Sequence, residues 1–146
     1  MTLTQFLLAR ITEDEQLAMM ATPGRWSRSG QQLQAHRQDG MPYGAVARNP
    51  RLMSGTWKRN ADHIARHEPA RVLTECESKR RIIALHQLVP YKQPQLDSGW
   101  ETVESTRCLR CTHDMDWMEI TPVCDTLKAF VLPYANHPDY REEWRL

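Results

Sequence analysis

The 146-residue sequence contains no long apolar run, and its charges nearly cancel. No stretch approaches the roughly 20 apolar residues that a membrane-spanning helix needs. The opening residues, MTLTQFLLARITEDEQ, have neither the basic flank nor the uninterrupted apolar core of a secretion signal. The 19 basic and 18 acidic residues give a formal net charge of +1, so there is no bulk attraction to nucleic acid or to membranes. We therefore expect a cytoplasmic protein with no membrane contact.

Cysteine is also scarce, but three of the four cysteines fall in one short stretch, RCLRCTHDMDWMEITPVCDTLKAF. Their spacing is Cys108-x2-Cys111-x12-Cys124. In a reducing compartment, clustered cysteines are more often metal ligands or catalytic thiols than structural disulfides. Two residues between Cys108 and Cys111 allow both sulfurs to face one ion, and structural zinc binds four sulfur or nitrogen ligands. Three cysteines therefore require a fourth ligand.

His86 is the strongest candidate for that ligand, because it ends a predicted helix on its inward face and begins the segment that leads to Cys108. Two alternatives remain open. His113 would close a small ring with Cys111, and Cys76 lies in mid-helix on an apolar face, as small buried residues often do. We predict a structural zinc site formed by His86, Cys108, Cys111 and Cys124.

Other chemistry is compatible with the same cysteines. Arg107 and Arg110 would favour a thiolate in a redox pair, but the polar, turn-like sequence after Cys111 is unlike the helix that normally follows such a pair. Unliganded thiols are a further alternative. Asp116 or Glu119 could serve an open catalytic zinc, although the His-x-Glu element of zinc deaminases is absent. These observations favour a protein that is not an enzyme.

The pattern of apolar residues predicts a mainly helical α+β fold in a single domain over residues 1–146. Thr2 and Gln5 have the spacing of a capping box, and an apolar stripe follows at helical spacing until Pro23 and Gly24. That stripe consists of Leu3, Phe6, Leu7, Ile11, Leu17 and Ala18. Residues 25–58 are interrupted by glycine and predict a short β element of two or three strands, or a meander.

The second half of the chain predicts a bent central helix and a zinc-clasped C-terminal helix. Asn60 is a suitable N-cap, and Pro69 is expected to open a longer helix rather than to break one. Residues 86–124 form the zinc-binding connection, in which 89–106 contain at most one short strand. Thr121-Pro122 suits the start of the last helix, which carries the apolar residues Leu127, Phe130, Val131 and Tyr134 before Pro133 ends or kinks it, and Trp144 is expected to fold back.

Surface residues suggest two kinds of partner. Met19 and Met20 are candidates for an exposed protein-binding surface, as are some of the tryptophans, Trp57, Trp100, Trp117 and Trp144. A basic band on the central helix could bind nucleic acid, although interleaved glutamates favour ion pairs on a solvated face. This band contains Arg66, Arg71, Lys79, Arg80 and Arg81. His63 and His67 are four residues apart, and packing or helix-end contacts are expected there more than metal binding.

Three stretches resemble one known family: FLLARITEDEQLA, HIARHEPARVLTECESKRRIIALH and CDTLKAFVLPYANHPDYREEWRL. This family is domain of unknown function 6221, found in actinobacteria and their phages. The resemblance covers the first twenty residues and most of the chain from Asp62. It also implies that Cys108, Cys111, Cys124 and His86 match recurrent family positions, while Glu68 replaces the usual aspartate and residues 25–58 do not align. It supplies an origin but no function.

The sequence thus predicts a small zinc-stabilised, non-enzymatic protein that acts through protein–protein interaction, with a regulatory role and a host or phage protein as partner. A homo-oligomer is compatible with the same features. The alternative is a nucleic-acid-binding zinc module that uses Arg66, Arg71, Arg80 and Arg81.

Overall fold

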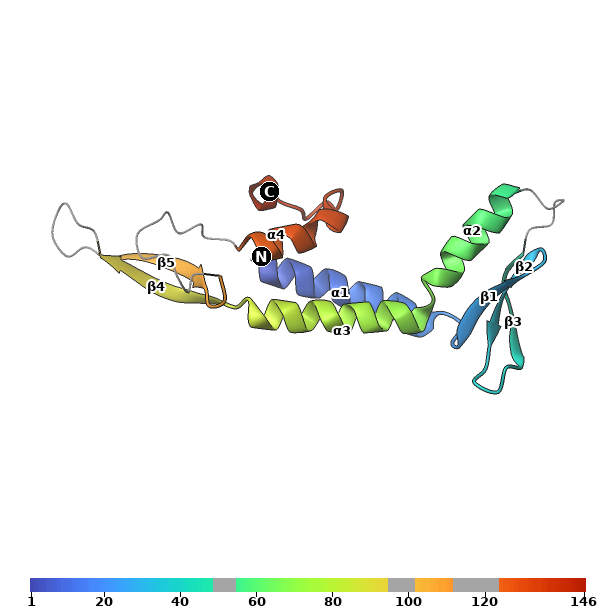
Figure 1. The fold of residues 1–146 in the computed structure, drawn as a ribbon. Helices are drawn as coiled ribbons and strands as arrows, with labels where there is room; N and C mark the ends of the chain where they lie inside the picture. The colour runs from blue at the N-terminus through green and yellow to red at the C-terminus, as the bar shows by residue number, and fades with distance from the viewer. Residues whose placement is uncertain (49–54, 95–101, 112–123) are drawn as a thin grey trace. The chain divides into compact units, whose positions relative to one another are not determined.

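The computed structural model describes residues 1–48, 55–94, 102–111 and 124–146, and its fold class is α+β, as predicted (Figure 1). Contacts within the chain define two units: Met1–Arg10 with Lys79–Leu146, and Ile11–Ser78. The first is called the metal-site unit below and the second the sheet unit. The prediction of a single domain over residues 1–146 stays a prediction.

The N-terminal helix α1 spans Leu3–Met20 and begins with the predicted capping box. The Thr2 N–H donates to Gln5 Oε1 at 2.9 Å, and the Gln5 N–H donates to Thr2 Oγ1 at 3.2 Å. These reciprocal bonds satisfy two backbone donors that the first turn of a helix leaves free. Five members of the predicted apolar stripe are buried: Leu3, Phe6, Leu7, Ile11 and Ala18. Leu17 is 65% exposed, so its assignment to the stripe was wrong; it lies about 100° around the helix from the buried Ala18.

The sheet unit contains an antiparallel three-stranded sheet in the order β1 (Arg25–Ser29), β2 (Gln32–His36) and β3 (Pro42–Arg48). This confirms the predicted meander. A two-residue turn joins β1 to β2, and Gly30 has φ of 57° there; within the part of the chain that the structure describes, only glycines have positive φ. Glycine at the first central position is typical of a type II′ hairpin turn.

The predicted bent central helix consists of two helices, α2 (Gly55–Arg66) and α3 (Pro69–Leu85). Pro69 opens α3 as expected, and the Glu68 carbonyl accepts the first helical hydrogen bond from the Val72 N–H. The predicted N-cap at Asn60 was wrong, because α2 already begins at Gly55. Asn60 is exposed inside the helix, where asparagine costs well under ~1 kcal/mol and does not force a helix start.

The metal-site unit contains a two-stranded antiparallel ribbon, β4 (Leu88–Pro94) paired with β5 (Thr102–Cys108). The prediction of at most one strand in 89–106 was therefore wrong. The Leu109 N–H donates to the Gln87 carbonyl, so the alternation of an antiparallel ladder places Pro90 and Pro94 at positions that do not hydrogen-bond to β5. Proline lacks only an outward-facing N–H there, and an edge strand tolerates that.

The C-terminal helix α4 (Asp125–Val131) continues into the 3-10 turn η1 (Leu132–Tyr134), and a last turn, η2 (Glu142–Trp144), follows. Leu127 and Val131 are fully buried. Trp144 folds back as predicted and packs on Phe6, with ring centroids 5.0 Å apart. Thr121-Pro122, the predicted helix start, lies outside the described residues, and the N-cap of α4 is Cys124.

No helix in the described ranges combines the length and the apolar character needed to cross a bilayer.

Candidate metal site

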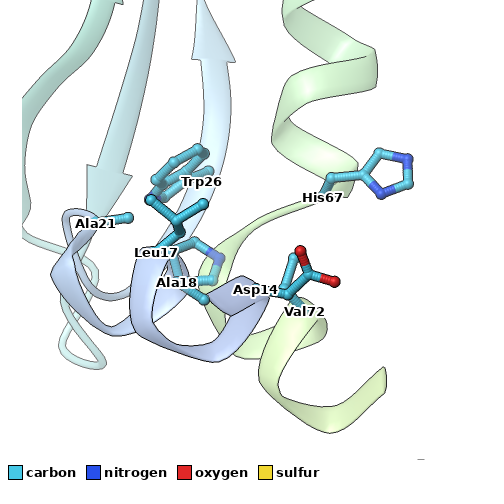
Figure 2. Close-up of a pocket in the computed structure, with 8 residues that line it drawn as sticks. Asp14, Leu17, Ala18, Ala21, Trp26, His67 and Val72 are labelled. Carbon is cyan, nitrogen blue, oxygen red and sulfur yellow. The ribbon is translucent and has the colours of Figure 1, made fainter. Parts of the chain in front are cut away.

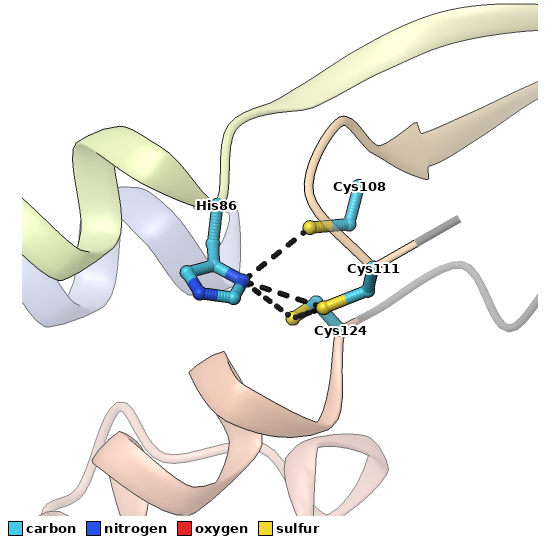
Figure 3. A group of neighbouring side chains, drawn as sticks. All are labelled: His86, Cys108, Cys111 and Cys124. Atoms are coloured by element: carbon cyan, nitrogen blue, oxygen red, sulfur yellow. Dashed lines mark hydrogen bonds between the residues drawn. The ribbon is translucent and has the colours of Figure 1, made fainter. Parts of the chain in front are cut away.

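Four separate elements of the metal-site unit bring one side chain each to a common point (Figure 3). His86 directly follows α3, Cys108 is the last residue of β5, Cys111 lies in the turn after β5, and Cys124 is the N-cap of α4. These are the four residues that the sequence put forward as ligands. The pairing of Leu88 with Cys108 explains the meeting of two of them, because it places the start of β4 beside the end of β5.

The donor atoms lie close together around the imidazole nitrogen. His86 Nδ1 is 3.5 Å from Cys108 Sγ, and it is 3.4 Å from both Cys111 Sγ and Cys124 Sγ. Cys111 Sγ is 3.4 Å from Cys124 Sγ. All four donor atoms fall within 4.8 Å of one another.

These separations fit a tetrahedral ion. Bonds of about 2.3 Å to sulfur and about 2.0–2.1 Å to nitrogen place a sulfur and a nitrogen ligand about 3.6 Å apart, and two sulfur ligands about 3.8 Å apart. The three sulfur–nitrogen distances of 3.4–3.5 Å are within about 0.2 Å of that value, and the 3.4 Å between the sulfurs of Cys111 and Cys124 is about 0.4 Å shorter than the sulfur–sulfur value. The four residues therefore have both the donor types and the spacing that a closed metal site requires.

Hydrogen bonding alone does not account for the arrangement. A neutral imidazole nitrogen carries either one proton or one lone pair, so Nδ1 can form a good hydrogen bond with one sulfur at a time. Here three sulfurs approach that nitrogen at nearly equal distances. Convergence of several donors on one point is what a shared cation produces.

The electrostatics of the thiols also favour a cation. Cys111 is exposed, but its sulfur is partly desolvated where it faces the other donors, and this desolvation, followed by the neighbouring thiols of Cys124 and Cys108, raises the pKa of Cys111 to about 12. Without a metal, Cys111 thus keeps its proton at neutral pH, whereas a coordinating thiol loses its proton. Metal uptake must release protons, so the apparent affinity is expected to rise with pH.

Cys124 differs because it lies at the start of α4. Burial acts to raise the pKa of Cys124, but the backbone N–H groups of Leu127 and Thr126 and the Cys111 thiol act against it, and the net direction is down. Backbone donors that stabilise a thiolate make Cys124 the thiol best prepared to meet a cation.

The structure describes Cys76, one of the alternative ligands, but not the others. Cys76 is buried in mid-α3 and does not belong to the convergent group. His113, Asp116 and Glu119 lie outside the described residues. None of the four cysteines, all of which lie in the described ranges, forms a disulfide bond, and the 3.4 Å between the sulfurs of Cys111 and Cys124 is far longer than the ~2.05 Å of such a bond.

The sheet unit has a separate, shallow pocket of about 250 Å³ (Figure 2). Leu17, Ala18, Ala21 and Trp26 supply apolar surface, and Asp14 and His67 are its charged or titratable side chains. Sequence analysis did not anticipate this pocket, because α1, β1 and the start of α3 are distant in sequence. The sequence also contained no sign of a hydrogen bond beside this pocket, in which the backbone N–H of Trp26 donates to Glu68 Oε2 at 2.8 Å.

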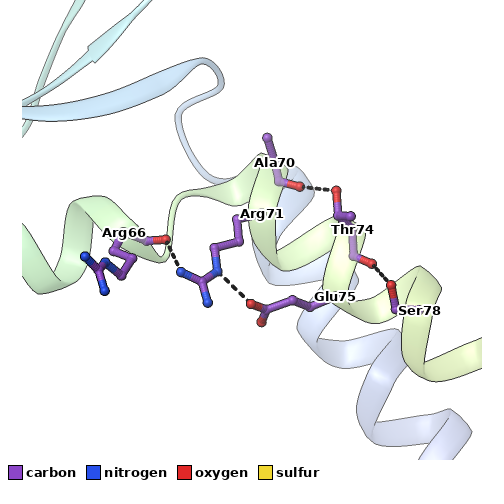
Figure 4. Close-up of polar contacts among 6 residues, drawn as sticks. All are labelled: Arg66, Ala70, Arg71, Thr74, Glu75 and Ser78. Atoms are coloured by element: carbon purple, nitrogen blue, oxygen red, sulfur yellow. Dashed lines mark hydrogen bonds and ion pairs between the residues drawn. The ribbon is translucent and has the colours of Figure 1, made fainter.

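The other charged residues singled out in the sequence have local roles in the structure. His63 and His67 are exposed, and their ring centroids are 4.7 Å apart. Arg71 donates to Glu75 at 2.6 Å and to the Arg66 carbonyl at 3.3 Å (Figure 4). Part of the basic band therefore forms an ion pair within α3, as the interleaved glutamates indicated.

One family matches the chain, over residues 1–146, and its description is "Family of unknown function (DUF6221)". This match confirms the family resemblance and extends it to residues 25–58, which the resemblance did not cover. No curated protein and no solved structure matches the sequence. The site must therefore be interpreted from its own geometry.

Proposed function

The chain belongs to the DUF6221 family, and because that family has no known activity, we propose from the site itself that the protein is a small, zinc-stabilised, non-enzymatic interaction protein. The observation that carries the proposal is the approach of Cys108, Cys111 and Cys124 to His86 Nδ1 at 3.4–3.5 Å. Three cysteines and one histidine are a common ligand set of structural zinc. Carboxylate-binding metals such as magnesium and calcium prefer oxygen donors, which this group lacks.

A structural role suits the composition of the site. A catalytic zinc keeps one coordination position open for water or substrate, whereas four protein ligands fill a tetrahedral shell. The ligands come from the end of α3, the end of β5, the following turn and the start of α4. One ion would therefore join segments separated by up to 38 residues and supply folding free energy to a unit with few long elements.

A protein partner is supported by exposed apolar side chains near the end of α1. Leu17, Met19 and Met20 are 65%, 69% and 76% exposed, respectively. Methionine side chains are flexible and polarizable and adapt to varied partner surfaces. The proposed partner is a host or phage protein, and the proposed role is regulatory. The proposed location is the cytoplasm of an actinobacterial cell, with or without phage infection, because thiols remain reduced there.

The test is the zinc content of the purified chain, measured by native mass spectrometry and by elemental analysis. We expect one zinc per wild-type chain and almost none in His86→Ala. Cys76→Ala is the matched control, because it removes a buried cysteine outside the convergent group and should keep one zinc. A wild-type chain without metal, or a His86→Ala variant that keeps its zinc, would contradict the assignment.

A further inference from the structure

The two faces of the three-stranded sheet differ in chemistry. Leu33 and Ala35 of β2 are fully buried, and α2, which packs against β1 and β2, contributes the buried Ala61. Successive side chains of a strand point to opposite faces, so the alternate residues of β2 lie on the face away from Leu33 and Ala35. Those residues are Gln32, Gln34 and His36.

The strand register identifies their neighbours on that face. Across from His36 and Gln34 lie Arg25 and Ser27 of β1, and across from Gln32 lies Arg48 of β3. Two register shifts interrupt the pairing of β2 with β3, where Ala45 and Pro42 lie across from Gln34 and His36. We call this set the polar sheet face: Arg25, Ser27, Gln32, Gln34, His36 and Arg48. Its members hydrogen-bond across and along the strands, with Ser27 Oγ 2.9 Å from His36 Nε2 and Gln34 donating to Gln32 at 3.1 Å. These contacts hold the side chains in a defined array.

The charge on the polar sheet face has one sign. Its arginines, Arg25 and Arg48, are exposed, and neither forms an ion pair with any residue in the described part of the chain. Arg28 projects from the opposite face, where it donates to Asp62 of α2 at 2.8 Å. Residues 25–48 contain four arginines and a single acidic residue, Asp39. A chain that is nearly neutral overall thus concentrates positive charge in this segment.

We propose that the polar sheet face binds the major groove of double-stranded DNA. Strands in a sheet are about 4.7–4.9 Å apart, and the major groove, which is ~12 Å wide, admits a two-stranded β-ribbon. All members of the polar sheet face except Arg48 lie on the β1–β2 ribbon, and Arg48 lies on the neighbouring strand β3, where it can reach a phosphate. Arginine pairs with guanine and glutamine with adenine through two hydrogen bonds each, and arginine also binds phosphates. Both residue types occur on this face, together with serine and histidine.

Duplex DNA fits this face better than single-stranded nucleic acid. Proteins that bind single strands stack bases on aromatic side chains. The tryptophan of β1, Trp26, is opposite the buried Ala35 and donates its indole N–H to the Thr22 carbonyl on that side. The exposed aromatic of β3, Tyr43, carries the Arg37 guanidinium over its ring, 5.1 Å from the centroid. The six residues of the polar sheet face therefore offer hydrogen-bonding groups and cations.

This assignment differs from a nucleic-acid site on the central helices. Arg71 of the basic band is already engaged by Glu75 and the Arg66 carbonyl (Figure 4), whereas Arg25 and Arg48 have no carboxylate partner among the described residues. The proposal does not depend on zinc, because the polar sheet face lies entirely in the sheet unit and the four proposed ligands lie in the metal-site unit. It also uses none of the residues proposed to contact a protein partner.

The experiment is fluorescence anisotropy of the full-length, zinc-loaded chain with a labelled 20-base-pair duplex of mixed sequence, at 50 and 200 mM salt. Arg25→Gln/Arg48→Gln is the test variant, and Arg66→Gln/Arg71→Gln is the control with the same change in charge. We expect the wild type and the control to bind, and the test variant to bind at least tenfold more weakly. Loss of two phosphate contacts would lower the slope of log K against log salt by about 1.8.

A second variant, Gln34→Glu, places a carboxylate at the centre of the face without removing an arginine, and it should also abolish binding. Circular dichroism of each variant establishes that the fold is retained. The proposal is overturned if the wild type does not bind at 50 mM salt, if the test variant binds as the wild type does, or if both folded variants keep their affinity. Equal or tighter binding of single-stranded DNA, or of anionic lipid vesicles, through the same arginines would also overturn it.

Discussion

The sheet unit and the metal-site unit are built on different physical principles. In the sheet unit, three strands and α2 bury Leu33, Ala35 and Ala61 with no convergent group of metal ligands among its described residues. In the metal-site unit, the β structure is a two-stranded ribbon, and the C-terminal helix α4 has seven residues. An isolated hairpin and a helix this short are each marginal in water.

This difference indicates where the proposed metal would contribute most to stability. Three strands with a covering helix can supply a hydrophobic core of their own. The metal-site unit has a core around Phe6, Leu127, Val131 and Trp144, but the four ligands stand where the ribbon, α3 and α4 meet. A metal at that point would fix elements that side-chain packing holds only in part.

The largest expected effect is therefore confined to the metal-site unit. Removing zinc with a strong chelator should speed amide hydrogen exchange in β4, β5 and α4 at least 100-fold, a loss of about 2.7 kcal/mol of local stability. Exchange in β1, β2 and β3 should change much less, because no proposed ligand lies in these strands. Hydrogen exchange followed by mass spectrometry measures both regions in one sample.

His86→Ala should reproduce the pattern of the chelator, and Cys76→Ala should not. Uniform acceleration over both units would mean that the metal site stabilises the whole chain rather than one unit. If the chelator does not change amide hydrogen exchange in a zinc-loaded sample, the metal does not stabilise the metal-site unit, and the proposed difference between the two units is wrong.

The converse experiment is Leu33→Ala in β2. Leu33 is fully buried, and removing a buried leucine side chain costs about 2–5 kcal/mol. We expect a lower midpoint of chemical denaturation and faster exchange in β1–β3, while native mass spectrometry still finds one zinc per chain. A matched control is Leu17→Ala on the 65% exposed Leu17, which should cost about 0.5 kcal/mol or less. Zinc loss in a folded Leu33→Ala variant would show that the two units depend on each other.

Local sequence signals predicted the parts of the fold that depend on local chemistry. The capping box at Thr2 and Gln5, the opening of α3 at Pro69 and the meander between residues 25 and 48 all follow from residues within a few positions of one another. The ligand group was also put forward from spacing, because Cys108-x2-Cys111 constrains two sulfurs and His86 occupies a helix end. The identity of the bound metal remains a prediction.

The error in β4 arose where a distant partner decides the outcome. Strand β4 contains Pro90 and Pro94, and proline normally argues against a strand. The register with β5 shows that the backbone nitrogens at both positions point away from β5, so no hydrogen bond of the ribbon is lost. The error at Asn60 was local: asparagine has the chemistry of an N-cap but is also tolerated inside a helix, and α2 starts five residues earlier, at Gly55. The polar sheet face could not be predicted from the sequence either, because its residues come together only through the register of three strands.

The smallest expected effect tests a single contact that ties the sheet to the start of α3. Trp26 pairs with Ala35 at a position where its N–H points away from β2, and Glu68 Oε2 accepts that N–H at 2.8 Å. Glu68→Ala leaves a partly buried donor without its acceptor and should cost about 1–2 kcal/mol of unfolding free energy. Glu68→Gln keeps an acceptor oxygen and should lose about half of that or less, as measured by urea denaturation. Equal losses in both variants would mean that the negative charge, and not the hydrogen bond to β1, is what Glu68 contributes to the sheet unit.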